Sequence, residues 1–402
     1  MPIGDPPEPR LVESANEIAE KMRFAGPRDG ALGKVIFFIG AGCSVTAGIP
    51  AAVEIARLTT REVGRRFGCC SDKDDCVVAY RSLVGRKYLT DAGGGLPLAD
   101  QSDEKIDWYR VYDEMFRRHY ATPDDTRSLF GKIVGDTKGA INWAHLCLGE
   151  LASRGFVSTV LTTNFDQLVL SGMVRAGLLP VVCDGVDSLN RIAGAPQHAQ
   201  LVELHGSRHT YLLRNRPEDV KEVWQNPQAS AAVQKLLQHA TTFVVVGYGG
   251  REEGVMDLLI QAAEVYRDKN LFWVQHSVDP KRLPEKAKRF LGTSRNGGLL
   301  IGQDSDVFFL ELCRALGVGA PTALLDPLRS VKRVIEDVEG SRVTNTDIRS
   351  EINSAKARFS FLSETLANAA RTTDDVIAEI REMRLAGKYA EAYRLAEKAL
   401  ER

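Results

Sequence analysis

The chain has 402 residues, the length of about two to three domains, and its 44% hydrophobic and 26% charged residues are ordinary for a globular protein. A formal net charge of −1 excludes a global basic field, so we expect nucleic acid to be bound only through a partner. The seven cysteines are odd in number and irregularly spaced, which favours reduced thiols in a cytoplasmic protein over a disulfide framework. No apolar run approaches the roughly 20 residues that a membrane helix needs, so we expect no membrane anchor.

The N-terminal residues, MPIGDPPEPR, are rich in proline and charge and lack the apolar core of a signal peptide. They predict a disordered leader over residues 1–10. The apolar residues of the next stretch, LVESANEIAEKMRFAG, recur at helical spacing, and Gly26-Pro27 is a helix stop. Residues 1–28 are therefore interpreted as a leader and a helix ahead of the first domain.

The stretch VIFFIGAGCSVTAGIP predicts a buried parallel strand, a tight glycine turn and a helix that begins near Ser44. Gly40 and Gly42 let the backbone approach a pyrophosphate closely, and a helix N-terminus offers free N–H groups to it. The stretch differs from a P-loop, because GK[ST] is missing, and from GxGxxG, because Gly48 comes too late. The alternative is a tight strand–helix turn that binds no ligand.

A polar and aromatic segment over about residues 69–135 contains YRSLVGRKYL and DWYRVYDEMFRRHYA and predicts an inserted group of helices. Two interpretations stay open: the insertion covers the mouth of a site, or it has no such role. Its cysteines, Cys69, Cys70 and Cys76, have no second pair at zinc spacing, so we expect no metal.

Strands alternate with helices after the insertion, which predicts a Rossmann-like parallel sheet covered by helices on both faces within a domain over residues 29–325. The expected strands are VSTVLTTNFD, AQLVELHGS, TTFVVVGYGG, KNLFWVQHS and GGLLIG, and the expected helices are 167–176, 228–239, 253–267 and 305–316. Such sheets bind ligands at the carboxyl ends of their strands. Polar motifs at these strand ends therefore predict one shared site.

The last segment, residues 326–402, is all helical by pattern. The expected helices are LRSVKRVIEDVEG, TDIRSEINSAKARFSFLSETLANAA, TTDDVIAEIREMRLAG and YAEAYRLAEKALER. The last two resemble a tetratricopeptide helix pair. Because one pair cannot bury a solenoid core, we expect the repeat to continue past residue 402; the alternative is a helical cap on the first domain.

Four motifs occur in a fixed order along the chain: GAGCSVTAGIP (40–50), TTNFD (162–166), LHGS (204–207) and VVGYGG (245–250). Together they resemble the sirtuin superfamily, whose members carry a GAG-x-S-x-x-x-GIP loop, a T-x-N-x-D strand end and an HG motif. The resemblance covers roughly residues 30–320, with the insertion interrupting it, and it implies that the ligand is NAD.

The resemblance also assigns a cofactor-binding role to the residues at matching positions, which are Gly40, Ala41, Gly42, Ser44, Asp166, Gly247 and Tyr248. It implies that Ala41 and Gly42 line the pyrophosphate, with Ser44 beside it. It implies that Asp166 holds the nicotinamide carboxamide, although a strand-end or helix-capping carboxylate is the alternative. Gly247 and Tyr248 are expected near the adenosine side.

Asn164 and His205 are the catalytic residues that the resemblance implies. Cleavage of the nicotinamide–ribose bond generates oxocarbenium-like charge at the sugar, and a neutral amide such as Asn164 orders the ribose or water without adding a counter-charge. A histidine with a pKa near neutrality accepts the proton released as the ribose reacts, which is the role expected of His205.

Departures from the deacylase sirtuins set the expected reaction. Pro50 is followed by AAVEIARL, which continues as helix, where deacylases carry an Asp-Phe-Arg segment, and their two-pair zinc module is missing. These departures resemble the sirtuin-like domains of bacterial antiphage proteins, so we expect an NAD glycohydrolase in abortive infection. Its expected partners are a second copy of itself in a homo-oligomer and a phage protein trigger or a partner defence protein. The alternatives are an NAD-dependent deacylase and a non-catalytic NAD or ADP-ribose sensor.

Overall fold

The computed structural model describes residues 8–71, 73–90, 105–135, 140–206, 227–250, 253–325, 328–339, 345–385 and 388–400. Most of the expected N-terminal leader and the last residue of the LHGS motif lie outside these ranges. Contacts divide the chain into two compact units, Met1–Pro321 and Thr322–Arg402. Within the described part of the chain, no helix has the length and apolar character needed to span a bilayer.

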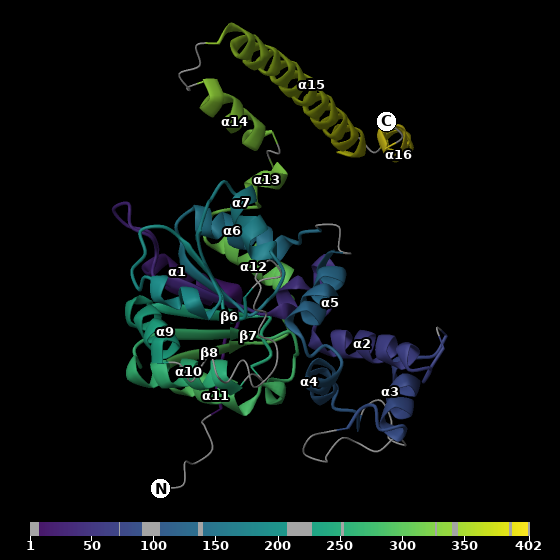
Figure 1. The fold of residues 1–402 in the computed structure, drawn as a ribbon. Coiled ribbons are helices and arrows are strands. Elements are labelled where there is room, and N and C mark those ends of the chain that lie inside the picture. Colours follow the sequence, from purple (N-terminus) through teal and green to yellow (C-terminus); the bar gives the residue numbers. More distant parts are fainter. Residues whose placement is uncertain are drawn as a thin grey trace. The chain divides into compact units, whose positions relative to one another are not determined.

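An eight-stranded parallel sheet forms the middle of the first unit, in the order β1-β8-β7-β6-β2-β3-β5-β4 (Figure 1). The strands are β1 (Arg10–Leu11), β2 (Val35–Ile39), β3 (Val157–Thr162), β4 (Val181–Asp184), β5 (Gln200–Glu203), β6 (Thr242–Val246), β7 (Asn270–Val274) and β8 (Asn296–Leu300). The predicted parallel α/β sheet is confirmed.

Helices cover both faces of this sheet, as the strand–helix alternation predicts. One face packs against α1 (Ala15–Phe24), α6 (Trp143–Ser153), α7 (Leu168–Arg175) and α12 (Ser305–Ala315). The other face packs against α9 (Pro227–His239), α10 (Glu253–Val265) and α11 (Glu285–Gly292). The expected helices at 167–176, 228–239, 253–267 and 305–316 agree with α7, α9, α10 and α12.

The central strand β2 is apolar throughout because it contributes to both cores. Ile36 and Phe38 lie in the core on one face, and Phe37 and Ile39 lie in the core on the other. All five residues of the strand are buried. Side chains that alternate between two covered faces leave no position for a polar residue, which is why the sequence of such a strand is a continuous apolar run.

The two short edge strands, β1 and β4, are not predicted by the hydrophobic pattern of the sequence. The expectation of a disordered leader through residue 10 is wrong at its end, because Arg10 begins β1 and pairs with Gly298 of β8. Strand β4 is an outer strand on which Val181 and Val182 are exposed. Both strands are defined by pairing to a neighbouring strand, so their own residues carry little local signal.

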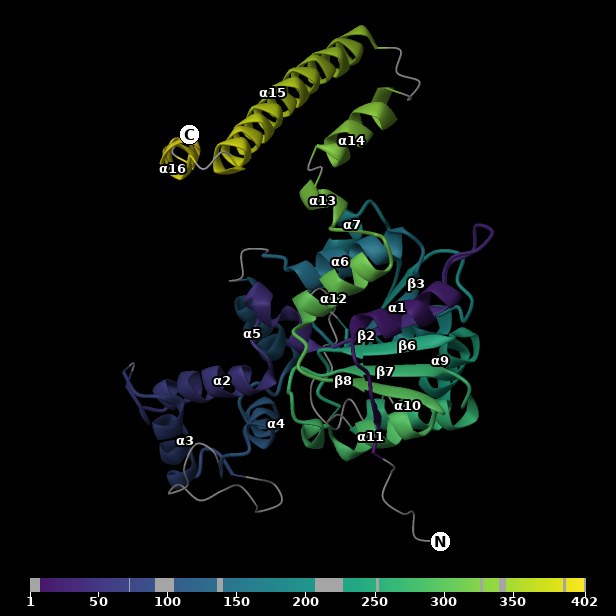
Figure 2. The same ribbon diagram turned by 180° about the vertical axis from the view of Figure 1, so that it is seen from behind.

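A helical insertion lies at the carboxyl ends of the strands, as the two views in Figures 1 and 2 agree. It consists of α2 (Ala52–Arg66), α3 (Cys76–Gly85), α4 (Trp108–Arg118) and α5 (Pro123–Gly135). Its own core gathers around Tyr80, Trp108 and Phe116. Helix α2 shares this core through Ile55 and Val63, so the insertion includes residues ahead of the start expected near residue 69.

The second unit contains α13 (Thr322–Leu325), α14 (Arg329–Glu339), α15 (Thr346–Leu385) and α16 (Tyr389–Leu400). The prediction of two helices over residues 346–387 is wrong, because α15 is one helix of 40 residues. Its middle contains no glycine or proline, and the Thr372-Thr373 pair does not stop a helix. Helix α16 packs on α15 and buries Ala392. The tetratricopeptide-like character of this region stays a prediction.

Glycines bring the ends of β2 and β6 into backbone contact. A Cβ added at Gly40 would lie 2.5 Å from the Cα of Tyr248, and one at Gly42 would lie 2.8 Å from the carbonyl oxygen of Gly247. Gly247 has a φ of +66°, and a Cβ there would lie 2.5 Å from the backbone nitrogen of Cys43. These glycines are therefore required by packing between two backbones.

We expect Gly247→Ala to lower the free energy of unfolding by about 3 kcal/mol, because it combines a left-handed backbone with a clash against another backbone. Gly249→Ala is the matched control, since a Cβ at Gly249 has no heavy atom within 4 Å. Urea denaturation of both variants measures the difference. Equal stability of the two variants would show that the contact between the β2 and β6 ends does not constrain the fold.

Candidate functional site

Four neighbouring strand ends bring the predicted site residues to one edge of the sheet. Gly40 follows β2, Asn164 lies just beyond β3, His205 just beyond β5, and Gly247 follows β6. The chain order reverses at β2, since β3 pairs on one side of it and β6 on the other. Parallel sheets bind ligands at the carboxyl ends of strands where the order reverses.

The glycine turn after β2 enters a helix, as expected, but this helix is a 3₁₀ helix, η1 (Ala41–Ala47), which begins ahead of Ser44. Gly48 adopts the left-handed conformation and ends η1, and α2 begins only at Ala52. The backbone N–H of Gly42 donates to the carbonyl oxygen of Gly247 at 2.8 Å. Gly42 is exposed, but its backbone N–H is already bonded within the protein and is not available as a donor to a ligand.

A chain of buried hydrogen bonds joins three of the predicted residues. The amide Nδ2 of Asn164 donates to Ser44 Oγ at 3.1 Å and to the carbonyl oxygen of Gly40 at 3.2 Å. Ser44 Oγ in turn donates to Asp166 Oδ2 at 2.8 Å. The exposed fractions of Ser44, Asn164 and Asp166 are 0%, 5% and 5%. We call this arrangement, from Gly40 through Asn164 and Ser44 to Asp166, the polar chain.

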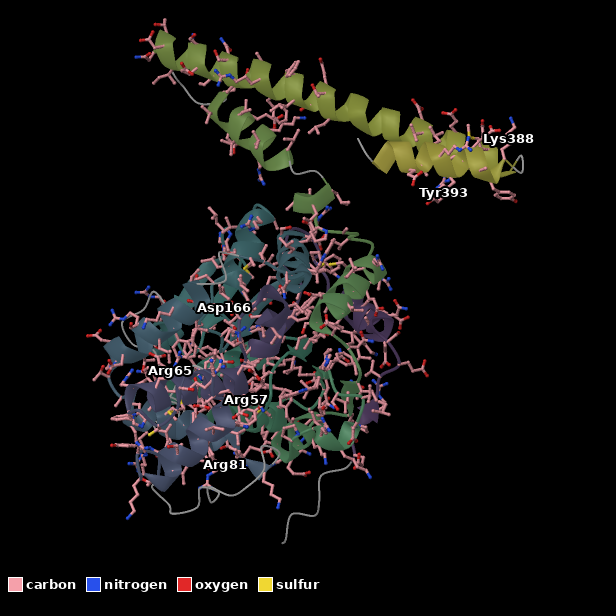
Figure 3. The ribbon with its side chains drawn as sticks, turned by 90° about the vertical axis from the view of Figure 1, so that its right-hand side faces the viewer. Arg57, Arg65, Arg81, Asp166, Lys388 and Tyr393 are labelled. Carbon is pink, nitrogen blue, oxygen red and sulfur yellow. The ribbon has the colours of Figure 1, made fainter. Side chains whose placement is uncertain are left out.

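The second oxygen of Asp166 connects the polar chain to a helix. Asp166 Oδ1 accepts a hydrogen bond from the backbone N–H of Leu168, the first residue of α7, at 3.0 Å. The helix-capping alternative raised by the sequence therefore describes part of what this carboxylate does. Figure 3 shows Asp166 among the side chains in the interior of the first unit.

One polar atom of Asn164 has no partner among the described residues. The side-chain oxygen Oδ1 is buried and accepts no hydrogen bond, although both Nδ2 donors are used. A buried amide oxygen without a donor costs free energy, about 1–3 kcal/mol. An atom that is held in place by its neighbours and left without a donor fits a ligand hydroxyl or an ordered water.

His205 contacts Phe165, the residue between Asn164 and Asp166 in the sequence. The rings of Phe165 and His205 have centroids 6.2 Å apart, and Phe165 also contacts Phe130 of α5, with centroids 4.5 Å apart. His205 is buried. The helical insertion therefore contacts the residue that stands between Asn164 and Asp166 in the sequence.

The side chain of Tyr248 packs in the core on one face of the sheet, although its backbone contacts Gly40 of the polar chain. Its ring lies 4.6 Å from that of Phe38 and 6.0 Å from that of Trp273, measured between centroids, and its side chain belongs to the core on one face of the sheet. The structure thus brings Ser44, Asn164 and Asp166 into contact, places His205 against the ring of Phe165, and positions Tyr248 in the core.

A second buried polar pair, Asn142 and His145, supports η1 from the other side. Asn142 Nδ2 donates to the carbonyl oxygen of Cys43 and to Thr46 Oγ1, both at 2.6 Å. The ring Nδ1 of His145 bonds with Asn142 Oδ1. Burial lowers the pKa of His145, while the charge of Asp166 acts in the opposite direction. Asn142, the N-cap residue of α6, thus holds η1 in place, and no motif in the sequence pointed to it.

Glu203 is a buried carboxyl group that the motif analysis missed. It ends β5 two residues before His205 and accepts a hydrogen bond from Gln167 Nε2 at 2.9 Å. Burial and the negative charge of Asp184 raise the pKa of Glu203 to about 7, although the Gln167 hydrogen bond acts in the opposite direction. A carboxylate at the end of an apolar strand was the available signal in LVELHGS.

The thiol nearest the glycine turn is structural. Burial raises the pKa of Cys43 to about 12, so the thiol stays protonated at neutral pH. Its Sγ–H donates to the carbonyl oxygen of Val246 at 3.4 Å. Within the described residues, no group of three or more His, Cys, Asp and Glu side chains is arranged to hold a metal ion.

Comparison with known families finds a match to the SIR2-like domain over residues 158–294. That segment contains the TTNFD, LHGS and VVGYGG motifs. A comparison with curated proteins finds no match.

Comparison with solved structures finds sirtuins. One is Sir2 bound to an acetylated peptide, with 14% identity, coverage of 76% of this chain and 100% of that chain, and a TM-score of 0.39. Another is Sir2 with a p53 peptide and NAD+, with 15% identity, coverage of 75% and 98%, and a TM-score of 0.38. A third, from work on the mechanism and regulation of Sir2 enzymes, has 14% identity, coverage of 76% and 98%, and a TM-score of 0.38. At these values the likeness decides nothing about the reaction.

The raised pKa of Glu203 predicts a pH-dependent stability. Because the folded state holds this proton up to about pH 7 while the unfolded chain releases it near the ordinary glutamate pKa of 4.5, the folded protein binds more protons between these values. The free energy of unfolding therefore falls as pH rises from 5 to 7, by at most about 1.4 kcal/mol per pH unit from this group.

Glu203→Gln keeps the shape and the Gln167 contact but removes the titration. Urea denaturation at pH 5, 6, 7 and 8 should show a stability difference between wild type and variant that changes up to pH 7 and then levels off. A difference that is constant across this range would mean that Glu203 is ionised throughout.

Proposed function

We propose that this protein hydrolyses NAD to nicotinamide and ADP-ribose. The observation that carries the proposal is the buried, partnerless Oδ1 of Asn164, which the polar chain holds at the sheet edge where α/β proteins bind ligands. The match of residues 158–294 to the SIR2-like domain supports NAD as the molecule bound there.

The residues present fit NAD at the ribose end of the site. Asn164 Oδ1 needs a donor, and a ribose hydroxyl or an ordered water supplies one. Ala41 and the backbone of Gly42 are exposed and would line the pyrophosphate. Gly247 is used in packing against Cys43, and Tyr248 is buried in the core, so these two would shape the adenosine side from behind.

Hydrolysis requires that water add to the anomeric carbon of the ribose as the bond to nicotinamide breaks, with one proton released. Asn164 orients the ribose or the water without placing a negative charge against it. His205 accepts the released proton, for which an imidazole is suited near neutral pH. Asp166, with Oδ2 held by Ser44, would accept a hydrogen bond from the carboxamide N–H of the nicotinamide.

The chain around η1 favours hydrolysis of NAD over removal of an acyl group from a lysine peptide. After Pro50 the chain passes directly into α2, whose apolar face is used inside the helical insertion. The insertion then contacts the site through Phe130 and Phe165. Water is the nucleophile that needs no further binding groove.

The biological setting belongs to the same proposal. An enzyme that destroys NAD must be held inactive until it is needed, which fits the effector of an abortive infection system in the bacterial cytoplasm. The second unit, with α15 and α16 as a tetratricopeptide-like pair, would receive the trigger, a phage protein or a partner defence protein. Assembly into a homo-oligomer is the proposed means of control.

We expect Asn164→Ala and His205→Ala each to lower NAD hydrolysis at least about 100-fold, because each removes a group that orients water or accepts the proton. Release of nicotinamide from NAD without any peptide, followed by chromatography, measures the rate. His198→Ala is the control, since His198 is exposed and lies on the loop before β5.

The same samples are incubated with an acyl-lysine peptide and searched for O-acyl-ADP-ribose by mass spectrometry. The proposal expects nicotinamide and ADP-ribose alone. Peptide-dependent turnover that yields O-acyl-ADP-ribose, with NAD left intact in the absence of peptide, would replace hydrolysis by deacylation.

A further inference from the structure

The long helix α15 has an apolar seam of the kind that pairs two helices. Apolar residues recur at alternating intervals of four and three along its first half, at Ile348, Ile352, Ala355, Phe359, Leu362 and Leu366. The same register returns at Val376, Ile380 and Met383. This is the heptad repeat, in which one face of each helix packs against one partner helix. We call the first six residues the α15 seam.

Much of the α15 seam is open to solvent within a single chain. Ile348, Leu362 and Leu366 are 50%, 50% and 52% exposed. Helix α14 reaches α15 through an ion pair between Glu339 and Lys356, and yet these three residues stay exposed. An apolar stripe at heptad spacing that the described residues of its own unit leave exposed marks a surface for pairing with another helix.

At the C-terminal end of α15, the apolar residues of the same register are covered by α16. Ile380 lies with Ala392 and Tyr393 around a small cavity between α15 and α16, and Ala392 is almost fully buried. Figure 3 marks Tyr393 on α16 and Lys388 just before it, beside the end of α15. Helix α16 therefore partners the C-terminal end of α15. Helix α14 contacts the first half of α15, but among the described residues it leaves Ile348, Leu362 and Leu366 of the seam exposed.

We propose that residues 348–366 of α15 pair with the same residues of a second copy of this chain, parallel and in register, as a two-stranded coiled coil. The charges beside the seam select this arrangement. In a parallel pair, the residues just before Ile352, Phe359 and Leu366 of the seam each face the partner residue five positions later. Glu351 then faces Lys356 of the other copy, an attractive pair, and Arg358 faces the neutral Ser363.

An antiparallel pair of the same residues is disfavoured by like charges. Matching the seam in that direction places Arg358 opposite Arg358 of the other copy, and Lys356 opposite its own equivalent. Like charges across a helix pair are repulsive and act against that orientation. The seam specifies the partner as another identical helix, and the flanking charges specify its direction. The inference gives an interface to the homo-oligomer of the proposed function, but it does not rest on the proposed reaction, because no residue of the site takes part.

The test is the mass of the full chain in solution, measured by sedimentation equilibrium over about 1–100 µM. Wild type is expected to be a dimer in the upper part of this range. Leu362→Lys places a charge in the seam and should give a monomer throughout. Phe361→Lys is the matched control, since Phe361 is 69% exposed on the same helix but lies off the seam, and it should still dimerise.

A charge exchange tests the direction. Glu351→Lys makes the facing pair repulsive in the parallel arrangement and should weaken the dimer at least about tenfold, whereas adding Lys356→Glu to it should restore association. Far-UV circular dichroism confirms that each variant is folded.

A wild-type chain that stays monomeric, a Leu362→Lys chain that dimerises like wild type, or a failure of the double variant to recover association would each overturn the proposal. The first of these results would assign the seam to a different protein, and the second would assign self-association to another surface.

Discussion

The hydroxyl group of Ser44 is the point on which the site depends. It accepts a hydrogen bond from Asn164 and donates one to Asp166, and so uses its single donor and one acceptor position on two residues from the end of β3. Ser44 itself comes from η1, after β2, so the bond pair fixes the ends of two adjacent strands to each other. Because all three side chains are buried, each has few alternative partners and a defined orientation. The orientation of Asn164 is what leaves its Oδ1 without a donor.

The contact between the backbones at the ends of β2 and β6 gives the glycines of the GAG turn a structural role, whereas the sequence motif suggests a ligand-binding one. The GAG turn indicates a phosphate loop, and glycine is required there for close approach. In the structure, the close approach of Gly40 and Gly42 is to Gly247 and Tyr248 at the end of β6. The glycines therefore build the edge of the sheet that carries the site. Ala41 and Gly42 stay exposed, and their surface is where we propose that the ligand makes contact.

The sheet was predictable because its central strands are apolar runs that use both faces, as in β2, and because helices separate them. The grouping of Ser44, Asn164 and Asp166 followed from the rule that parallel strands end at one edge. Strand β1 was not predictable, since its two residues are ordered by pairing with β8. Asn142 was not predictable as a neighbour of the site, because no local pattern encodes its contact with Cys43. Glu203 had a local signal, a carboxylate at the end of an apolar strand, but nothing in the sequence pattern encodes its contact with Gln167.

Binding of carba-NAD, a non-hydrolysable analogue, to wild type and to Ser44→Ala tests the central claim most directly. Isothermal titration calorimetry measures the dissociation constant without interference from turnover. The account predicts binding to wild type and a loss of at least about tenfold in Ser44→Ala, since Asn164 and Asp166 both lose a buried partner, equivalent to at least about 1.4 kcal/mol. Equal affinity of the two folded proteins for carba-NAD, or no binding by wild type, would contradict it.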